Sequence, residues 1–476
     1  MNNASPTPDR ADLVRYFDEL APGRDRWRVR NRYYHQQLAH TFTFLIPPGR
    51  AVLEVGSGTG ELLAALQPQR GLGIDVSPAM TSLAQVKFPH LEFRTCDIEQ
   101  LPLNEKFDYV VMSDLIGFLH DVQRSLENLR QVCSPQTRVV ISYYNFLWEP
   151  LLKLAERLHL KARQPVLNWV APADVENMLD LAGFEVVRKL TRLVLPLNVP
   201  LLSPLCNRLL ANLPGIRKLS LVSVLVARPQ PVARSTTPRV SVIIPARNER
   251  GNIEAVVTRT PELGAATELI FVEGNSSDGT AEEIQRVIAR HPERRIKLVL
   301  QGQGRGKGDA VRRGFAAATG ELLMILDADL TMPPEELPKY CEALVSRKVE
   351  FVHGSRLVYP MDQQAMRSLN ILGNKFFSLA FSYLLDQRFK DTLCGTKALW
   401  RADYEQISAG RAYFGDFDPF GDFDLIFGAA KLNLKIKEIP IHYKERSYGT
   451  TQISRFRHGW LLLQMTWFAM WKMKFV

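Results

Sequence analysis

The sequence predicts an α/β protein built from two tandem domains. Its 476 residues are 46 % apolar and 23 % charged, which is typical of globular proteins long enough for several cores. Strand-like apolar runs alternate with helical patterns in two series that begin at Ala51 and Val240, and this alternation indicates mostly parallel sheets. A stretch rich in Pro, Ser, Thr and Arg separates the two series. The predicted boundaries are a first domain at 1–229, a linker at 230–238, a second domain at 239–458 and a tail at 459–476.

The charge of the chain favours anionic partners, since the formal net charge is +10. Between Val186 and Asn248 there are ten Lys and Arg but no Asp or Glu. The last 46 residues, from Lys431, carry nine Lys and Arg against two Glu. Both segments are otherwise apolar, whereas basic clusters that bind nucleic acid are expected on polar faces. We therefore expect a membrane surface, and no nucleic acid, among the partners.

Several features indicate a cytoplasmic protein that is peripheral on the cytoplasmic face of a membrane. The five cysteines are scattered without a CxxC pair, which fits a reducing compartment. The first residues lack the apolar core of a signal peptide, and no run reaches the ~20 apolar residues of a spanning helix. The tail combines Trp460, Trp467 and Trp471 with basic residues, as in amphipathic helices at membrane interfaces. Residues 371–385 are a second candidate, and the alternative for both is packing on the core or in a dimer.

The first domain contains a glycine-rich turn followed by acidic residues at strand ends. Residues 52–60 read VLEVGSGTG, a strand that leads through three glycines to a helix, where the backbone can approach a ligand closely. The next strand ends in Asp75, fifteen residues after Gly60, and an acidic residue there can hold both hydroxyls of a ribose. The third strand ends in Asp97, beside Ile98.

This series resembles class I S-adenosyl-L-methionine (SAM)-dependent methyltransferases over about residues 15–228. The resemblance implies a Rossmann-like sheet with SAM as the cofactor, the glycine loop at its methionine end and Asp75 at its ribose. The residues implied to bind SAM are Glu54, Gly56, Gly58, Gly60, Asp75, Asp97 and Ile98.

The methyl acceptor is not indicated by the sequence. No Asn-Pro-Pro-Tyr motif follows the fourth strand, which disfavours adenine or glutamine N-methylation. His120 is a candidate general base for an oxygen acceptor, because an imidazole titrates near neutral pH. The alternative is a surface or helix-capping histidine.

The second domain places charged residues at the ends of its predicted strands. The strand at VSVIIPARNE leads to Asn248 and Glu249, and the next ends at Glu273. A basic, glycine-rich loop, QGQGRGKG, then suits a diphosphate. The following strand ends in Asp327 and Asp329, and two carboxylates one residue apart can share a divalent cation that bridges a diphosphate.

In this order, the motifs resemble family 2 glycosyltransferases with the GT-A fold, and within them the dolichol-phosphate mannose synthase group, over about residues 239–458. The resemblance implies Mg²⁺ or Mn²⁺ on Asp327 and Asp329, and an acceptor phosphate on Arg446, Arg455 and Arg457. The residues implied to bind a UDP- or GDP-linked sugar are Pro245, Asn248, Glu249, Glu273, Asp278, Arg305, Lys307, Asp327, Ala328 and Asp329.

The chain departs from that group at three positions. Gly274 replaces the second Asp of an Asp-Asp-Gly-Ser turn, which puts one nucleotide contact in question. Thr331 stands where the group often has Gln, and Gln452 where it usually has Lys.

Asp422 and Asp424 occupy the place of the family's acidic pair. With a hydroxyl acceptor, a carboxylate there acts as general base. A phosphate acceptor is already ionised near neutral pH, so that Asp424 only positions groups. The alternative is that both residues cap the following helix. With Arg446 and His120, they are the predicted catalytic residues.

The function expected is bifunctional. The second domain would transfer a sugar, with inversion, to a polyprenyl phosphate or another glycolipid acceptor, and the first would methylate a small molecule, lipid or glycan. Two alternatives remain open. The sugar acceptor could instead be a glycan hydroxyl, or one domain, more readily the first, is a non-catalytic SAM-binding or scaffold module.

Overall fold

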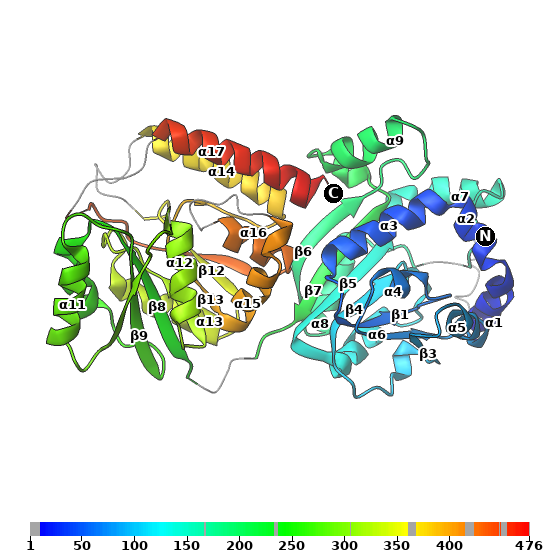
Figure 1. Cartoon of the computed structure of the whole chain (residues 1–476). Helices are drawn as coiled ribbons and strands as arrows, with labels where there is room; N and C mark the ends of the chain where they lie inside the picture. Colours follow the sequence, from blue (N-terminus) through cyan, green and yellow to red (C-terminus); the bar gives the residue numbers. More distant parts are fainter. Residues whose placement is uncertain are drawn as a thin grey trace. The chain divides into compact units, whose positions relative to one another are not determined.

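The computed structural model describes residues 10–165, 168–232, 237–304, 306–359, 368–414, 423–446, 448 and 455–475, with the backbone alone for 368–372 and 455–458. It divides into two compact units, and the division falls between Gln230 and Pro231. Each unit contains one mixed seven-stranded sheet with helices on its faces (Figure 1).

The first sheet has the strand order β3-β2-β1-β4-β5-β7-β6, in which β7 runs antiparallel to both of its neighbours. The order reverses direction between β1 and β4, and ligands of open α/β sheets bind at such a switch point. The strands are β1 Ala51–Val55, β2 Arg70–Asp75, β3 Glu92–Thr95, β4 Phe107–Ser113, β5 Cys133–Tyr144, β6 Phe184–Arg192 and β7 Val222–Pro229.

Glycine makes the turn after β1 possible. Gly60 has φ +85°, and a Cβ there would lie 2.6 Å from the ring of Phe93, so only glycine fits this turn. The helices of this unit are α1 Arg10–Leu20, α2 Arg24–Arg30, α3 Arg32–Leu45, α4 Glu61–Ala65, α5 Pro78–Lys87, α6 Val122–Leu129, α7 Glu149–Arg157, α8 Pro172–Leu181 and α9 Leu202–Pro204.

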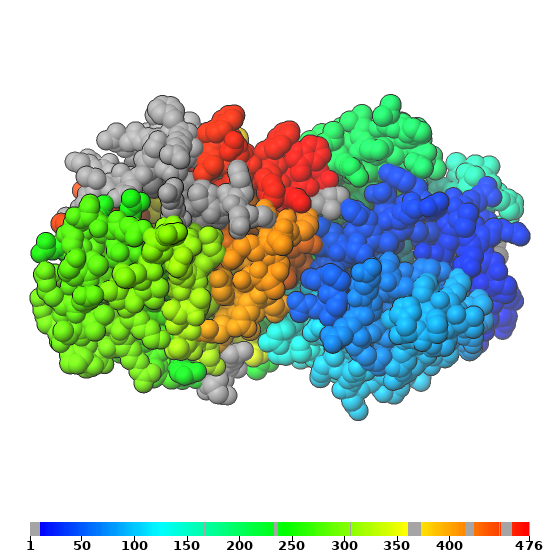
Figure 2. Space-filling model, viewed as in Figure 1, coloured from blue at the N-terminus to red at the C-terminus, as the bar shows by residue number. Residues whose placement is uncertain are grey.

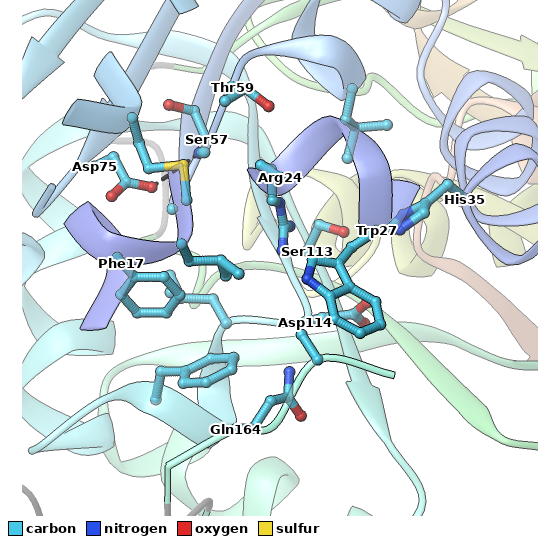
Figure 3. A pocket seen from close by; sticks show the side chains of 18 of the residues that line it. Phe17, Arg24, Trp27, His35, Ser57, Thr59, Asp75, Ser113, Asp114 and Gln164 are labelled. Atoms are coloured by element: carbon cyan, nitrogen blue, oxygen red, sulfur yellow. Dashed lines mark hydrogen bonds between the residues drawn. The ribbon is translucent and has the colours of Figure 1, made fainter. Parts of the chain in front are cut away.

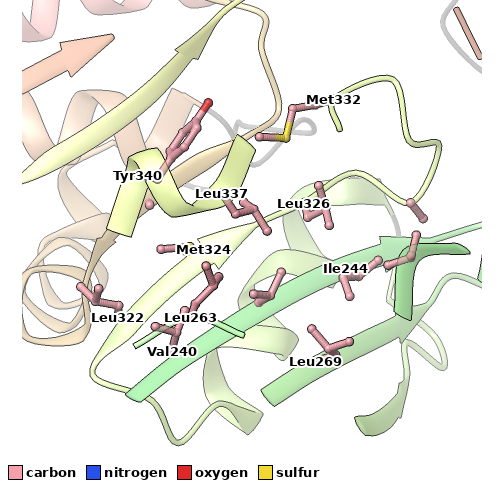
Figure 4. Close-up of a cluster of buried hydrophobic side chains, with 14 of the residues drawn as sticks. Val240, Ile244, Leu263, Leu269, Leu322, Met324, Leu326, Met332, Leu337 and Tyr340 are labelled. Atoms are coloured by element: carbon pink, nitrogen blue, oxygen red, sulfur yellow. The ribbon is translucent and has the colours of Figure 1, made fainter. Parts of the chain in front are cut away.

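The second sheet has the order β10-β9-β8-β11-β13-β12-β14, in which β13 runs antiparallel to both of its neighbours. On one face of the sheet, Val240, Ile244, Leu269 and Met324 pack against Leu337 of α13 (Leu337–Val345) in a fully buried core (Figure 4). The strands are β8 Arg239–Ala246, β9 Ala266–Glu273, β10 Arg295–Leu300, β11 Leu322–Ile325, β12 Phe351–Ser355, β13 Lys397–Trp400 and β14 Ile436–Pro440.

The end of the chain forms a helix that packs along α14 (Figure 1). Leu462 and Met465 of this helix are buried, while Trp460 and Trp467 are more than half exposed. No helix in the described ranges is long and apolar enough to cross a membrane. The helices of this unit are α10 Ile253–Arg259, α11 Thr280–Arg290, α12 Gly306–Ala317, α13 Leu337–Val345, α14 Ser368–Leu385, α15 Arg401–Ala409, α16 Phe423–Lys431 and α17 Arg455–Ala469.

A buried ion pair joins β12 to the loop before β13. Arg356 donates from Nε to Asp391 Oδ2 at 2.7 Å and from Nη2 to Oδ1 at 2.8 Å, and the Asp391 side chain is fully buried. Asn374 of α14 and the Leu393 amide also donate to Oδ1. The Arg356 guanidinium outweighs the effect of burial and holds the pKa of Asp391 well below its usual value.

We expect Asp391→Asn to lower the free energy of unfolding of the second unit by about 3–5 kcal/mol, because Arg356 would stay buried with its charge uncompensated. Urea unfolding followed by circular dichroism and by hydrogen exchange in the second unit measures this. The control is Glu335→Gln, which removes an exposed ion pair with Arg259 and is expected to cost less than about 1 kcal/mol. Equal costs for the two variants would contradict the assignment of the buried pair as a main support of this unit.

Candidate functional site

A cavity of about 560 Å³ lies in the first unit, at the carboxyl ends of β1, β2 and β4 (Figure 3). Its floor is the glycine loop after β1, and α1, α2 and α3 contribute much of its wall. Figure 3 shows Asp75 near Ser57, with Trp27 of α2 and Asp114 on the other side of the cavity. The cavity therefore lies at the switch point of the first sheet.

The glycine loop wraps around the carboxylate of Asp75. The Gly58 amide donates to Asp75 Oδ2 at 2.8 Å, and the Ser77 amide donates to Oδ1 at 3.0 Å. Gly56 has φ +71°, a backbone conformation that favours glycine, and a Cβ there would lie 2.7 Å from the side chain of Leu115. Burial raises the pKa of Asp75 above its usual value.

Six of the seven residues predicted to bind SAM line this cavity, and Gly60 shapes the turn beside them. Asp97 accepts the Glu99 amide and pairs with Arg10 of α1 at 2.7 Å. His120 lies at the edge of the cavity with its side chain exposed. These positions agree with a ligand site, and the role of each side chain remains a prediction.

Glu54 is, like Asp75, a buried acidic residue in this cavity wall. Its Oε2 accepts the Leu63 amide at 3.0 Å, so it holds the start of α4. Burial is the main cause that raises the pKa of Glu54 to about 8. The side chain is therefore protonated at neutral pH in the absence of a ligand.

A polar cluster deeper in the cavity was not predicted from the sequence. Tyr34 Oη donates to Asp114 Oδ2 at 2.5 Å, and Ser142 Oγ donates to Oδ1 at 2.8 Å. Asp114 directly follows β4 with φ +53°, and Lys161 Nζ lies 5.6 Å from the ring centre of Tyr144. The one signal in the sequence was a carboxylate directly after a buried strand. Tyr34 is 80 residues away and gave no signal.

In the second unit, Arg446 joins two of the predicted nucleotide-sugar residues. Its Nη1 donates to Glu249 Oε1 and its Nη2 to Asp329 Oδ2, both at 2.7 Å. The other oxygen of Asp329 accepts the amide and hydroxyl of Thr331. Thr331 therefore orients Asp329 in this structure.

Asp327, two residues after β11, is paired with a lysine in the first turn of α12. Lys307 Nζ lies 2.6 Å from Asp327 Oδ1. A Cβ on Gly395 would lie 2.2 Å from Asp327 Oδ2 and 2.3 Å from Lys307 Nζ, so a larger residue there would displace this pair. The sequence contained Gly395 in the motif CGTK, but its closeness to Asp327 comes from the pairing of β11 with β13. Ala328 is buried between the two carboxylates.

The remaining nucleotide-sugar residues lie at the ends of β8 and β9 and in the loops that follow them. Asn248, at φ +56°, accepts the Ser277 amide at 2.9 Å, and Glu273 accepts the Ser276 amide at 2.6 Å. Asp278 accepts the amides of Arg250 and Thr280, while Pro245 lies within β8. At Gly274, a Cβ would lie 3.2 Å from Gln301 and 3.3 Å from Arg247, which leaves little room for a larger side chain.

Asp424 is buried at the start of α16 and pairs with arginines. Its Oδ2 lies 3.2 Å from Arg411 Nε and 3.9 Å from Arg312 Nη1. The predicted residues Asp422, Arg305 and the departure Gln452 lie outside the described residues, as do the side chains of Arg455 and Arg457.

Asp327 and Asp329 fit a divalent cation by their chemistry. Mg²⁺ prefers oxygen ligands, and proteins commonly supply one or two carboxylates while the substrate phosphates supply the rest. The described ranges contain no group of three or more His, Cys, Asp or Glu side chains arranged for a metal. A cation here would therefore depend on the two aspartates and on the oxygens of a bound ligand.

Fold and sites define a protein of two α/β domains, each with its site at the carboxyl ends of its strands. Family models match both: the methyltransferase domain model matches residues 27–189, and the glycosyl transferase family 2 model matches residues 241–407. The chain thus carries a SAM-dependent methyltransferase domain followed by a family 2 glycosyltransferase domain.

The second domain is similar to polyprenyl-phosphate sugar transferases. The dolichol-phosphate mannosyltransferase of Saccharomyces cerevisiae is 41 % identical over 109 residues, which are 22 % of this chain and 40 % of that relative. That of Pyrococcus furiosus is 37 % identical over 122 residues, 25 % of this chain and 34 % of the relative. The undecaprenyl-phosphate 4-deoxy-4-formamido-L-arabinose transferase of Salmonella paratyphi B is 28 % identical over 224 residues, 46 % of this chain and 64 % of the relative. This chain thus spans a third to two thirds of their length.

Solved methyltransferases are similar to the first domain in fold. A SAM-dependent methyltransferase from Thermotoga maritima has a TM-score of 0.37 and 16 % identity, covering 45 % of this chain and 99 % of that one. The magnesium protoporphyrin IX methyltransferase of Synechocystis has a TM-score of 0.34 and 20 % identity, covering 47 % and 100 %. At these values neither structure bears on the substrate of this chain.

We expect Glu54→Gln to change how stability depends on pH. Between the ordinary pKa of a glutamate and about 8, the folded chain holds a proton that the unfolded chain has released, so the free energy of unfolding falls as pH rises through this window. The variant has no such proton, so at pH 8 and without ligand it should be more stable than the parent by roughly 1–4 kcal/mol. Urea unfolding across pH 5–8 measures this.

The matched control is Glu19→Gln on the exposed side of α1, which should follow the parent curve. Parallel curves for Glu54→Gln and the parent would show that Glu54 is ionised in the folded chain.

Proposed function

We propose that the second domain transfers a sugar from a UDP- or GDP-linked donor to a polyprenyl phosphate. The observation that carries this proposal is the alternation of charge at the end of β11, where Lys307 faces Asp327 and Arg446 faces Asp329. Carboxylates that hold a cation, next to side chains that bind phosphate, suit a nucleotide diphosphate leaving group. The names of the relatives, which all include a prenyl phosphate, support the acceptor.

In this proposal the residues of the chain bind and neutralise the donor. Lys307 exchanges Asp327 for phosphate oxygens, and Arg446 exchanges Asp329 while it stays bound to Glu249. Thr331 keeps Asp329 oriented. A divalent cation on Asp327 and Asp329 would neutralise further charge on the diphosphate. Fixed charges that stabilise a leaving group account for most of the rate enhancement in transfers of this kind.

The state of Asp424 favours a phosphate acceptor over a hydroxyl. A hydroxyl has to lose a proton as it attacks, and Asp424, the described carboxylate of the acidic pair, is already bound by Arg411 and Arg312. A phosphomonoester has a second pKa near ~6 and needs no base at neutral pH. A glycan hydroxyl is the second candidate acceptor, and it would require Asp424 to take that proton.

The test is sugar transfer by the full chain from a panel of labelled UDP- and GDP-sugars, with Mg²⁺ or Mn²⁺ and a membrane lipid extract. We expect a labelled lipid that Asp329→Ala reduces by at least ~100-fold, because the diphosphate charge is no longer neutralised. Asp424→Asn should reduce it by less than ~10-fold, since no base is needed. The exposed Glu335→Gln variant is the control for nonspecific loss.

A loss of several orders of magnitude in Asp424→Asn, with label in a glycan, would favour the hydroxyl acceptor instead. If no donor is consumed by the parent, the domain is a binding module and Gly274 is the first position to restore.

We propose that the first domain binds SAM in its cavity and methylates a small molecule, a lipid or a glycan. The cavity supports this because Asp75 and the glycine loop lie together at one side of it. Asp75 can hold the ribose of SAM there, and the backbone of the loop can hold its methionine end. SAM supplies an electrophilic methyl group, and the residues that face it would orient the acceptor. Asp114, held by Tyr34 and Ser142, is a partly buried carboxylate that faces the cavity and is placed for that task.

We expect the full chain to bind SAM in calorimetry, and Asp75→Ala to weaken binding at least ~10-fold, because each lost hydrogen bond to a charged group costs about 1.5–3 kcal/mol. His120→Ala should keep the affinity for SAM, since its predicted role concerns the acceptor. Thermal unfolding of each variant separates loss of binding from loss of fold. SAM binding without methyl transfer to any component of a cell extract would support the alternative of a non-catalytic module.

A further inference from the structure

Helix α7 of the first domain turns its apolar stripe toward solvent. Leu147 just before the helix, Leu151, Leu154 and Leu158 are spaced by four, three and four residues, so they lie on one helical face. Each is about half exposed, and Leu158 is 59 % exposed. An amphipathic helix normally buries this face against its own domain, so α7 presents a surface that the domain itself does not cover.

A second segment, residues 197–219, exposes a further set of leucines. Leu201 is 88 % exposed and has φ +64°, a backbone conformation that β-carbon-bearing residues rarely adopt. The segment surrounds α9 and projects from the surface of the first domain (Figure 2). Its exposed leucines are Leu197, Leu201, Leu202, Leu205, Leu209, Leu213 and Leu219.

The polarity of this second segment is inverted, with polar side chains inside and leucines outside. Asn207 is buried and donates to Tyr33 Oη of α3 at 3.0 Å, while its Oδ1 accepts the amides of Val194 and Leu195. Ser203 is fully buried and accepts the Val199 amide. These bonds hold the segment in place, so the outward leucines are a feature of the folded structure.

The two segments meet in one surface. Trp148 Nε1, at the start of α7, donates to the Leu219 carbonyl at 2.8 Å, and Asn145 donates to the Lys218 carbonyl at 2.8 Å. In Figure 1, α7 and α9 lie along the same edge of the first domain. We call Leu147, Leu151, Leu154 and Leu158, together with the exposed leucines of residues 197–219, the leucine face.

Charge complementarity indicates what covers the leucine face. Residues 186–248 contain no acidic side chain, and Arg208, Arg217 and Lys218 lie within the second segment. On α7, Lys153 is exposed but paired with Glu149, so the basic charge of the leucine face comes mainly from the second segment and from the exposed Arg157. Leucines flanked by Lys and Arg match a bilayer that contains anionic lipids, where apolar side chains enter the acyl layer and cations meet the headgroups.

The leucine face continues into the cavity of the methyltransferase domain. Leu197 is part of the leucine face and also lines the cavity. Leu160, which follows α7 and is 47 % exposed, lines the cavity as well. Leu152 and Ala155, on the inner side of α7, line the cavity as well. A bilayer bound to the leucine face would therefore meet the mouth of the cavity.

We propose that the leucine face docks the methyltransferase domain on an anionic membrane, and that the methyl acceptor enters the cavity from that membrane as part of a lipid. The docking stands on the surface alone, while the acceptor class rests on the methyl transfer proposed above.

The test is hydrogen exchange of the full chain with and without vesicles of phosphatidylcholine and phosphatidylglycerol in equal parts. We expect vesicles to slow exchange in residues 146–160 and 197–219. Unchanged exchange in these segments would overturn the proposal, even if the chain bound vesicles through its terminal helix α17. The proposal would also be overturned if exchange in these segments slowed equally without vesicles when the protein concentration was raised, and sedimentation showed a dimer. The leucine face would then be assigned to contact with a second copy of the chain.

A double variant and its control test whether the affinity for vesicles comes from the leucine face. Leu154→Glu combined with Leu201→Glu should weaken vesicle binding in flotation at least ~10-fold, because two apolar side chains no longer enter the bilayer. Leu181→Glu on α8 is the matched control, since Leu181 is 59 % exposed but lies outside the leucine face. Equal binding by the double variant and the control would contradict the proposal.

The acceptor is tested separately with labelled SAM and with vesicles or soluble extract as the methyl source. Labelled lipid from the parent, with less label from the double variant, would support a lipid acceptor. Label in soluble molecules alone would overturn it. Vesicle binding needs no SAM, so a failure of methyl transfer would count against the proposed function and leave the docking to stand on its own result.

Discussion

Parallel strands that end at one edge of a sheet bring the residues after them together, and both sites of this protein depend on this constraint. In the first domain, the turn after β1 and the carboxylate that ends β2 meet so closely that the Gly58 amide binds Asp75. In the second domain, the residues after β8 and β11 meet through Arg446. The topology of each sheet therefore sets the position of the site, and the residues of the loops set which groups it can bind.

Carboxylates in the second domain are neutralised in two different ways. Asp391 has a permanent partner in Arg356, with further donors on the same carboxylate, and this arrangement supports the fold. Asp327 and Asp329 are partly exposed, and their partners Lys307 and Arg446 come from the first turn of α12 and from the segment after β14. Pairs of the second kind can exchange partners, which suits a site that binds a charged ligand.

The leucine face suggests how the two activities could share a location. The second domain resembles transferases whose names include prenyl phosphates, and the first exposes a surface suited to anionic lipid. A membrane would supply both domains with their acceptors without any requirement that one product be the substrate of the other. The inverted polarity around Asn207 gives this idea a structural basis that composition alone did not provide.

The sequence by itself determined the two sheets, the glycine turns and the carboxylates at strand ends, because these depend on local pattern and on residues a few positions apart. Asp75, Asp327 and Asp329 were predictable for that reason. Only the tertiary structure decided that Arg446 binds Glu249, 197 residues away, and that Tyr34 binds Asp114. It also decided which face of α7 stays uncovered, since the period of a helix shows that one side is apolar but not whether other elements cover it. Such contacts depend on how distant segments pack, and that information is not contained in any short stretch of the chain.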